Sequence, residues 1–143
     1  LIVSQLPVLY TGHYYGTNVY HCTERPSCPL CQRAIGRQYR YVFCVHDIDL
    51  AETALLEVGH ATGMTIKAIA DEARLASCQG LQLRFSREGG RKRGRIITRR
   101  IEPPIIDPVA ALPAEIDIET ALRSTWAKQH SAQLTPEKAN TNE

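Results

Sequence analysis

The chain has 143 residues, of which 43% are hydrophobic, and a formal net charge of +2. This length predicts one domain, and no apolar run reaches the roughly 18 residues that a membrane-spanning helix needs, so we expect no membrane association. The sequence begins with Leu1 rather than Met, which indicates a trimmed N-terminus, and it shows no secretory leader. Five cysteines, an odd number, argue against a disulfide framework. We therefore expect a cytoplasmic protein in which Cys44 and Cys78 are small buried side chains.

A run of aromatic and polar residues at 9–22 predicts two short strands joined by a turn at residues 16–18. A polar connector over residues 23–38 follows and contains the sequence Cys-Pro-Leu-Cys. Zinc prefers thiolate and imidazole ligands, and structural zinc sites fill all four positions with protein side chains. The spacing therefore predicts one structural Zn²⁺ site, with the ligands His13, Cys22, Cys28 and Cys31.

Three alternatives to this site remain open in the sequence. A redox role for Cys28 and Cys31 would require a helix after a strand, and no helical period follows Cys31. A catalytic zinc would need an open position and a nearby acid or base, for which only Glu24 is close in sequence. His21 could replace His13 as a ligand, although it is adjacent to Cys22 and neighbouring residues of an extended chain point to opposite faces.

Residues 39–48 are rich in aromatic and β-branched types and predict a strand, and residues 53–58 predict a shorter one. The more apolar face of the first strand, which we expect to be buried, carries Tyr39, Tyr41, Phe43 and Val45. The opposite face carries Arg40, Val42, Cys44 and His46. Any of these rings that faced outward would instead be a platform for stacking on bases.

Apolar residues at helical spacing predict a helix over residues 63–78, which we expect to cap the sheet. Alternation then predicts a hairpin of strands at 81–85 and 95–101, joined through a glycine-rich turn. Between Arg84 and Arg100 the chain carries eight basic residues and one acidic residue. Such a basic block on a nearly neutral chain favours contact with a polyanion over a merely solvated surface.

Four prolines make residues 102–115 an extended connector. A final helix is predicted over residues 116–130, capped by Asp117 and carrying Ile118, Leu122 and Trp126 on one side. Trp126 is expected to anchor this helix by packing. The polar residues 131–143 are expected to be disordered.

The order of these elements predicts a mainly β fold. Short strands, one helix and a closing hairpin fit the five-stranded Greek-key barrel of the OB-fold, whose helix lies between the third and fourth barrel strands. We expect this core over residues 1–101, with a zinc-binding arm at about residues 12–38 inserted into it. The connector and the C-terminal helix follow the core.

The runs GHYYGTNVYHC, CPLC, YRYVFCVHDID and ALLEVG resemble the zinc-containing single-stranded DNA-binding proteins of phages and mobile elements. These are distant relatives of the helix-destabilising protein of T-even phages. The resemblance covers about residues 9–101 and implies an OB-fold core and a zinc subdomain with ligands in the order His, Cys, Cys-x2-Cys. The strongly acidic C-terminal tail of the phage proteins has no counterpart here, since residues 131–143 carry only Glu137, Lys138 and Glu143 as charged side chains.

The resemblance and the basic block together predict a protein that binds single-stranded DNA with little sequence preference in replication or recombination, and that catalyses no reaction. RNA is an alternative ligand, and a zinc-ribbon adaptor that docks on an acidic protein or a zinc- or thiol-dependent enzyme are alternative functions. The residues expected to contact nucleic acid are Tyr14, Tyr15, Tyr20, Arg33, Arg37, Arg40, Arg84, Arg87, Arg91, Lys92, Arg93, Arg95 and Arg99. Tyr14 or Tyr15 is expected to stack on bases, and Tyr41 and Phe43 to belong to the core.

Overall fold

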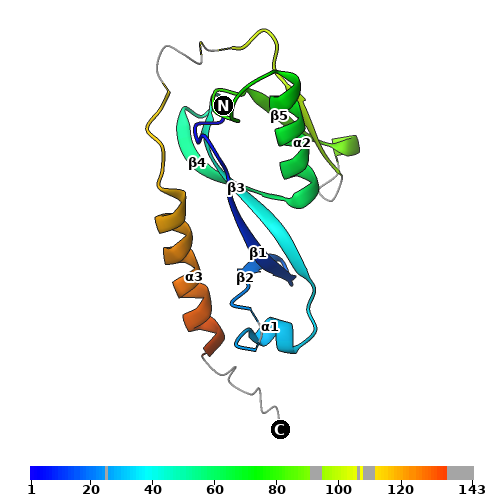
Figure 1. The fold of residues 1–143 in the computed structure, drawn as a ribbon, viewed down its shortest axis with the longest axis vertical. Coiled ribbons are helices and arrows are strands. Elements are labelled where there is room, and N and C mark those ends of the chain that lie inside the picture. The colour runs from blue at the N-terminus through cyan, green and yellow to red at the C-terminus, as the bar shows by residue number, and fades with distance from the viewer. Residues whose placement is uncertain (25, 91–94, 106, 108–111, 135–143) are drawn as a thin grey trace.

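The computed structural model describes all residues except 25, 91–94, 106, 108–111 and 135–143. Its main sheet has four antiparallel strands in the spatial order β2-β1-β3-β4 and curls into a half barrel (Figure 1). The strands are β1 (Val8–Tyr15), β2 (Asn18–His21), β3 (Arg37–Asp47) and β4 (Glu52–Gly59). All four strands were predicted, with bounds that differ by only a few residues.

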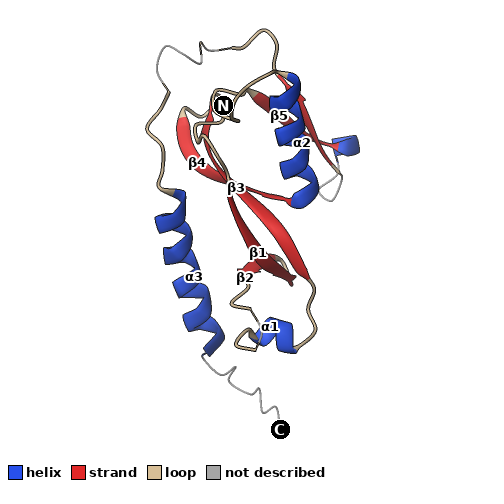
Figure 2. Ribbon diagram, in the orientation of Figure 1, coloured by secondary structure: helices blue, strands red, loops and turns tan. Residues whose placement is uncertain are grey.

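A helix and a hairpin follow the main sheet. The helix α2 spans His60–Glu72, and the strands β5 (Leu83–Arg87) and β6 (Ile96–Arg100) pair as a separate two-stranded sheet (Figure 2). The helix begins three residues earlier and ends six residues earlier than predicted. It ends early because Arg74 adopts a left-handed backbone conformation with φ of 55°, which a continuing helix does not allow.

The N-terminal segment connects the two sheets. The backbone N–H of Val3 donates to the carbonyl of Cys44 over 2.8 Å, and the N–H of Ile2 donates to the carbonyl of Leu81 over 2.9 Å. The predicted mainly β fold is confirmed, but the strands of the described residues form a four-stranded sheet and a separate two-stranded hairpin, not one continuous ladder. The hairpin reaches the main sheet through the N-terminal segment and through side-chain packing instead.

Two helices cover opposite faces of the main sheet (Figures 1 and 2). Under α2 lies a core cluster that includes Ile2, Phe43, Val58, Ile66 and Leu81. Under α3 (Ile118–Leu134) lies a second cluster that includes Val3, Tyr10, Val42, Cys44, Ile118 and Leu122. Burial of apolar side chains on both faces is the main stabilising contribution to such a three-layer arrangement.

The C-terminal helix has its predicted cap. The Asp117 carboxylate accepts a hydrogen bond from the backbone N–H of Thr120 over 3.1 Å, as an N-cap residue does. The helix continues to Leu134, so residues 131–134 are helical where a disordered tail was expected. The rest of that tail lies outside the described residues. No described helix has the length and apolar character needed to cross a bilayer.

The predicted burial of one face of β3 is partly wrong. Phe43 is 1% exposed, but Tyr39 on the same face is 58% exposed. Val42 and Cys44 on the other face are buried as well, because α3 covers them. The end of β3 that is nearest the arm extends beyond α2, which leaves the ring of Tyr39 accessible.

Candidate metal centre and nucleic-acid interface

Four buried side chains converge at the end of the molecule where β1 and β2 meet. The ligand atoms of His13, Cys22, Cys28 and Cys31 all lie within 4.8 Å of one another. The Nε2 atom of His13 lies 3.4 Å from the sulfur of Cys28 and 3.4 Å from the sulfur of Cys31, and the sulfurs of Cys22 and Cys31 are 3.5 Å apart. One metal ion could occupy the centre of this set.

Three local structures position the ligands. His13 lies on β1, Cys22 directly follows β2, and Cys28 caps the one-turn helix α1 (Pro29–Gln32), which contains Cys31. Pro29 favours this turn because its fixed φ suits the first helical position. Residues three apart on a helical turn lie on one side of it, so the turn directs both sulfurs inward. The helix ends one residue after Cys31, so a longer helix does not follow this cysteine in the described residues, as the sequence predicted.

The contacts of His13 fix which of its nitrogens faces the cysteines. Its Nδ1 atom lies 3.0 Å from the carbonyl oxygen of Ile35 and 3.2 Å from that of Gly36. A carbonyl oxygen only accepts hydrogen bonds, so Nδ1 carries the proton and donates it. Nε2 then presents its lone pair toward the sulfurs, as in metal-bound histidines that are held by a second hydrogen bond.

His21 is directed elsewhere. Its ring stacks on the indole of Trp126 with centroids 3.8 Å apart and planes 11° from parallel. The ring of Tyr10 lies 5.2 Å from the same indole. His13 is therefore the fourth member of the metal cluster, and Trp126 anchors α3 by packing, as predicted.

The thiols of the cluster differ in acidity. Burial raises the pKa of Cys22 to about 11. Burial also acts to raise the pKa of Cys28, but hydrogen bonds from the backbone N–H groups of Cys31, Thr23 and Leu30 outweigh it and lower that pKa to about 6. Cys28 therefore gives up its proton more easily than Cys22 does.

A row of partly exposed rings lies on the face of β3 that α2 only partly covers. The cross-strand partners Leu9 and Tyr41, and Thr11 and Tyr39, place their side chains on this face. Tyr39 is 58% exposed and Leu9 is 53% exposed, and the ring of His60 lies 6.1 Å from that of Tyr39. We call the surface formed by Leu9 and by the rings of Tyr39, Tyr41 and His60 the ring face. Arg37 lies two residues before Tyr39 on the same strand and is exposed.

The aromatic residues predicted to contact nucleic acid are not gathered on one face. Tyr14 and Tyr15 are 56% and 47% exposed, but as neighbours on β1 they point to opposite faces. Tyr20 is half-buried and packs against the metal cluster. Of this set, Tyr14 and Tyr15 have accessible rings.

The arginines predicted at the site also differ in their surroundings. Arg33 and Arg37 are exposed on the arm. Arg40 is less accessible to a nucleic acid than these two arginines, because its Nε atom lies 2.8 Å from Oε1 of Glu57 and its side chain is only 17% exposed. On the hairpin, Arg84, Arg87, Arg95 and Arg99 are exposed, and Arg91, Lys92 and Arg93 lie outside the described residues.

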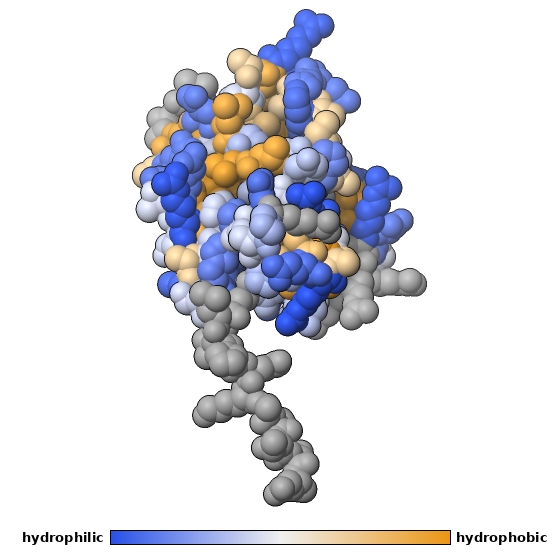
Figure 3. Space-filling model, turned by 60° about the horizontal axis from the view of Figure 1, so that its bottom comes forward, coloured by the Kyte–Doolittle hydropathy of each residue, from blue (hydrophilic) through white to orange (hydrophobic). Residues whose placement is uncertain are grey.

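The view onto the arm end of the molecule shows exposed apolar groups between hydrophilic ones (Figure 3). Tyr39 and His60 were not predicted to be surface residues of the site. One signal for Tyr39 was present, since it lies in the polar sequence Arg37-Gln38-Tyr39-Arg40 at the start of its strand. A strand that ran deep in the core at this point would not carry charges on both sides of a ring.

Comparison of the chain with protein-family models gave no match. Comparison with curated proteins gave none either, and neither did comparison with solved structures. The metal cluster and the ring face therefore rest on the geometry described above.

Proposed function

We propose that this protein binds single-stranded DNA with little sequence preference and keeps single strands accessible in replication or recombination. The observation that carries the proposal is the exposure of Tyr39 beside Arg37 on a strand whose continuation is buried core. Accessible rings next to cationic side chains are the means by which proteins stack on unpaired bases and hold the phosphates between them.

The metal in this proposal is a structural Zn²⁺. Three thiolates and one imidazole are the soft, tetrahedral donor set that zinc prefers. The four side chains are buried and leave no protein position of a tetrahedron open, which fits a structural ion better than a catalytic one. The ion would hold the arm against β1 and the start of β3, and so would fix the position of Arg37. Five free cysteines suit a reducing compartment such as the cytoplasm.

The fold in this proposal is an elaborated OB-fold. Three strands of the main sheet, β1, β3 and β4, are followed by α2 and by the hairpin of β5 and β6, which is the order of elements in that barrel. Hydrogen bonds from the N-terminal segment to both Cys44 and Leu81 are consistent with a first strand shared between two halves of a partly open barrel. The arm of β2 and α1 is then an insertion after the first strand.

Two other functions would use parts of the same surface. RNA offers the same phosphates and similar bases, and an adaptor that docks on an acidic protein would use the arginines of the hairpin. An adaptor that docks through the arginines of the hairpin does not need the exposed ring of Tyr39, whereas base stacking uses it. This difference favours nucleic acid.

A gel-shift panel tests the proposal. Labelled single-stranded DNA, duplex DNA and RNA of one length are titrated with the zinc-loaded chain at low and moderate salt. We expect single-stranded DNA to bind more tightly than duplex DNA, and the binding to weaken as salt rises. Binding of an acidic polypeptide in the absence of any nucleic-acid shift would favour the adaptor.

A further inference from the structure

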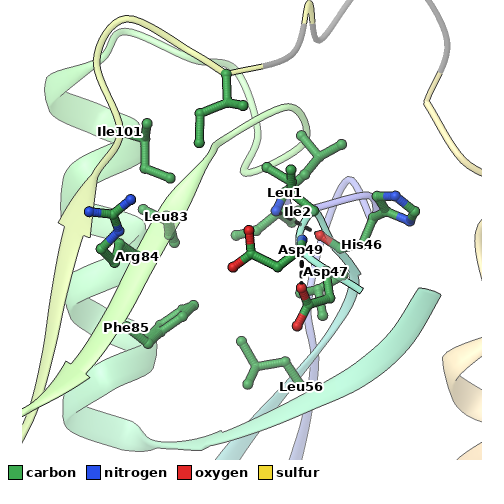
Figure 4. Close-up of a pocket in the computed structure, with 13 residues that line it drawn as sticks. Leu1, Ile2, His46, Asp47, Asp49, Leu56, Leu83, Arg84, Phe85 and Ile101 are labelled. Carbon is green, nitrogen blue, oxygen red and sulfur yellow. Dashed lines mark hydrogen bonds between the residues drawn. The ribbon is translucent and has the colours of Figure 1, made fainter. Parts of the chain in front are cut away.

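A cavity of about 350 Å³ lies where the hairpin and the main sheet face each other without a shared ladder (Figure 4). Its volume is within the range of about 300–1,000 Å³ that is typical of sites for small organic groups. The apolar part of its wall includes Ile2, Val45, Leu56, Leu83 and Phe85. Asp49 and Arg84 are among the polar residues of its lining. An apolar cavity with a few placed polar groups is suited to a flat organic ligand.

Phe85 gives the cavity an aromatic wall. The side chain is 39% exposed, and its ring projects into the cavity on the side facing Leu56 (Figure 4). A phenylalanine in such a position offers a π-face on which a planar group can stack, and stacking of this kind tolerates any base.

Asp49 gives the cavity a hydrogen-bond acceptor. The Asp47 carboxylate accepts the backbone N–H groups of Asp49 and Leu50 over 2.9 and 3.1 Å, which fixes the turn after β3. From this turn the Asp49 carboxylate points into the cavity (Figure 4). It makes no hydrogen bond or ion pair with another residue in the described part of the chain. Both of its oxygens are therefore available to a ligand.

Two arginines stand opposite each other on the face of the hairpin that is turned away from Leu83 and Phe85. Arg84 on β5 and Arg99 on β6 are direct cross-strand partners, and both are exposed. Among the described residues neither has an acidic partner, whereas Arg100 lies 2.7 Å from Glu102. Like charges directly opposite in a sheet are destabilising unless an anion lies between them. A phosphate group would remove this repulsion, and Arg is suited to hold it.

From the cavity, the ring of Phe85 and the carboxylate of Asp49 we infer that the cavity binds one guanine base of a bound DNA strand. The base stacks on Phe85, and the Asp49 carboxylate accepts the N1–H and N2–H donors of guanine. No other base presents two adjacent donors on its Watson–Crick edge: adenine and cytosine place an acceptor beside their amino group, and thymine has one N–H between two acceptors. The inference rests on the proposed function and adds one guanine preference to otherwise sequence-tolerant binding.

The test compares three strands in fluorescence anisotropy titrations with the zinc-loaded full chain. One strand is oligo-dT, the second has one central dG, and the third has deoxyinosine at that position, which lacks the N2 amino group. We expect the dG strand to bind about tenfold more tightly than oligo-dT, the scale of a good bidentate base contact. The inosine strand should lose most of that advantage.

Substitutions then locate the preference. Asp49→Asn should abolish the affinity ratio between the dG strand and oligo-dT, because an amide cannot accept two hydrogen bonds side by side, while its oligo-dT affinity should match that of the Glu52→Gln variant. Glu52→Gln is the matched control: it removes the same charge from an exposed residue outside the cavity lining and should keep the advantage. Phe85→Leu should reduce the advantage while the cavity stays apolar. Melting curves of all variants check that they fold.

Different results would contradict the proposed function and the guanine site. If the wild-type chain does not bind oligo-dT at low salt, the proposed function is wrong. If it binds oligo-dT but shows no preference for the dG strand, only the guanine site is overturned. A preference that survives Asp49→Asn overturns it equally.

Discussion

The ring of His21 stacks on the indole of Trp126 with centroids 3.8 Å apart, and the residue that follows His21 contributes a sulfur to the metal cluster. Adjacent residues of an extended chain point to opposite faces, so the stack and the cluster occupy opposite sides of the arm. The side chain of Gln129 makes two hydrogen bonds with the backbone of β2. Its amide nitrogen donates to the carbonyl of Val19, and its amide oxygen accepts from the N–H of His21. The C-terminal helix thus supports the arm from the face that the metal does not reach.

The first prediction concerns the metal. Elemental analysis should find about one zinc per chain, from the four ligands of a structural site. Cys28→Ser and His13→Ala should each lose the metal and unfold the arm, because binding energy at such a site is also folding energy. His21→Ala should retain the metal. Stoichiometric zinc in the His13→Ala variant, or loss of zinc in the His21→Ala variant, would show that His21 is the metal ligand and His13 is not.

The second prediction concerns the acidity of the cluster. In the metal-free protein Cys22, with a pKa near 11, is a thiol between pH 6.5 and 8.5, and a metal must displace its proton. Cys28, with a pKa near 6, is already a thiolate over most of this range. Apparent zinc affinity should therefore rise with pH, by about tenfold per unit for the Cys22 proton. Competition with a chromophoric chelator at three pH values measures this, and a flat profile would contradict the assignment.

The third prediction separates stacking from packing on one strand. Tyr39→Ala should weaken binding to oligo-dT by about 1–3 kcal/mol, the contribution of one stacked base, and leave the melting temperature nearly unchanged. Phe43→Ala should do the reverse, because deleting a fully buried ring costs about 3–5 kcal/mol of stability. Paired melting and affinity measurements on both variants give the comparison. Normal affinity in folded Tyr39→Ala protein would move the stacking surface to Tyr14 or Tyr15.

A fourth prediction tests the packing of α2 on the ring face. A methyl group on Gly63 would lie 2.5 Å from the Cδ2 atom of Tyr41 and 2.6 Å from its Cγ atom. Gly63→Ala should destabilise the protein, since overpacking of about 1–3 kcal/mol exceeds the helix-propensity gain of about 1 kcal/mol. Gly36→Ala, which meets no atom within 4 Å, is the control. Denaturant unfolding of both variants measures the difference, and equal stability would show that Tyr41 moves freely.

Much of the metal cluster could be predicted from the sequence, because ligand chemistry constrains both the residue types and their spacing. Cys22, Cys28 and Cys31 needed no knowledge of the fold. The choice of His13 over His21 did need it, since it depends on Trp126, which lies more than one hundred residues later in the sequence.

The strands were predictable for a similar reason: alternation and β-branched residues are local signals. The way in which the helices cover the sheet could not be predicted from such local signals. Whether Tyr39 is core or surface depends on where α2 ends its cover, and the burial of Cys44 depends on α3, which returns to the sheet after a long connector. The split between the main sheet and the hairpin depends on backbone pairing between distant segments, which no local pattern encodes.

The most direct measurement of the central claim is the salt dependence of oligo-dT binding by the zinc-loaded chain, followed by fluorescence anisotropy. Contacts between arginines and phosphates release counterions, so the logarithm of the affinity should fall linearly with the logarithm of the salt concentration, with a slope of about −0.7 for each phosphate contact on a single strand. The account predicts clear binding at low salt with a slope that corresponds to several contacts and that flattens in an Arg84→Gln, Arg99→Gln double variant. No binding at low salt, or a slope near zero, would contradict it.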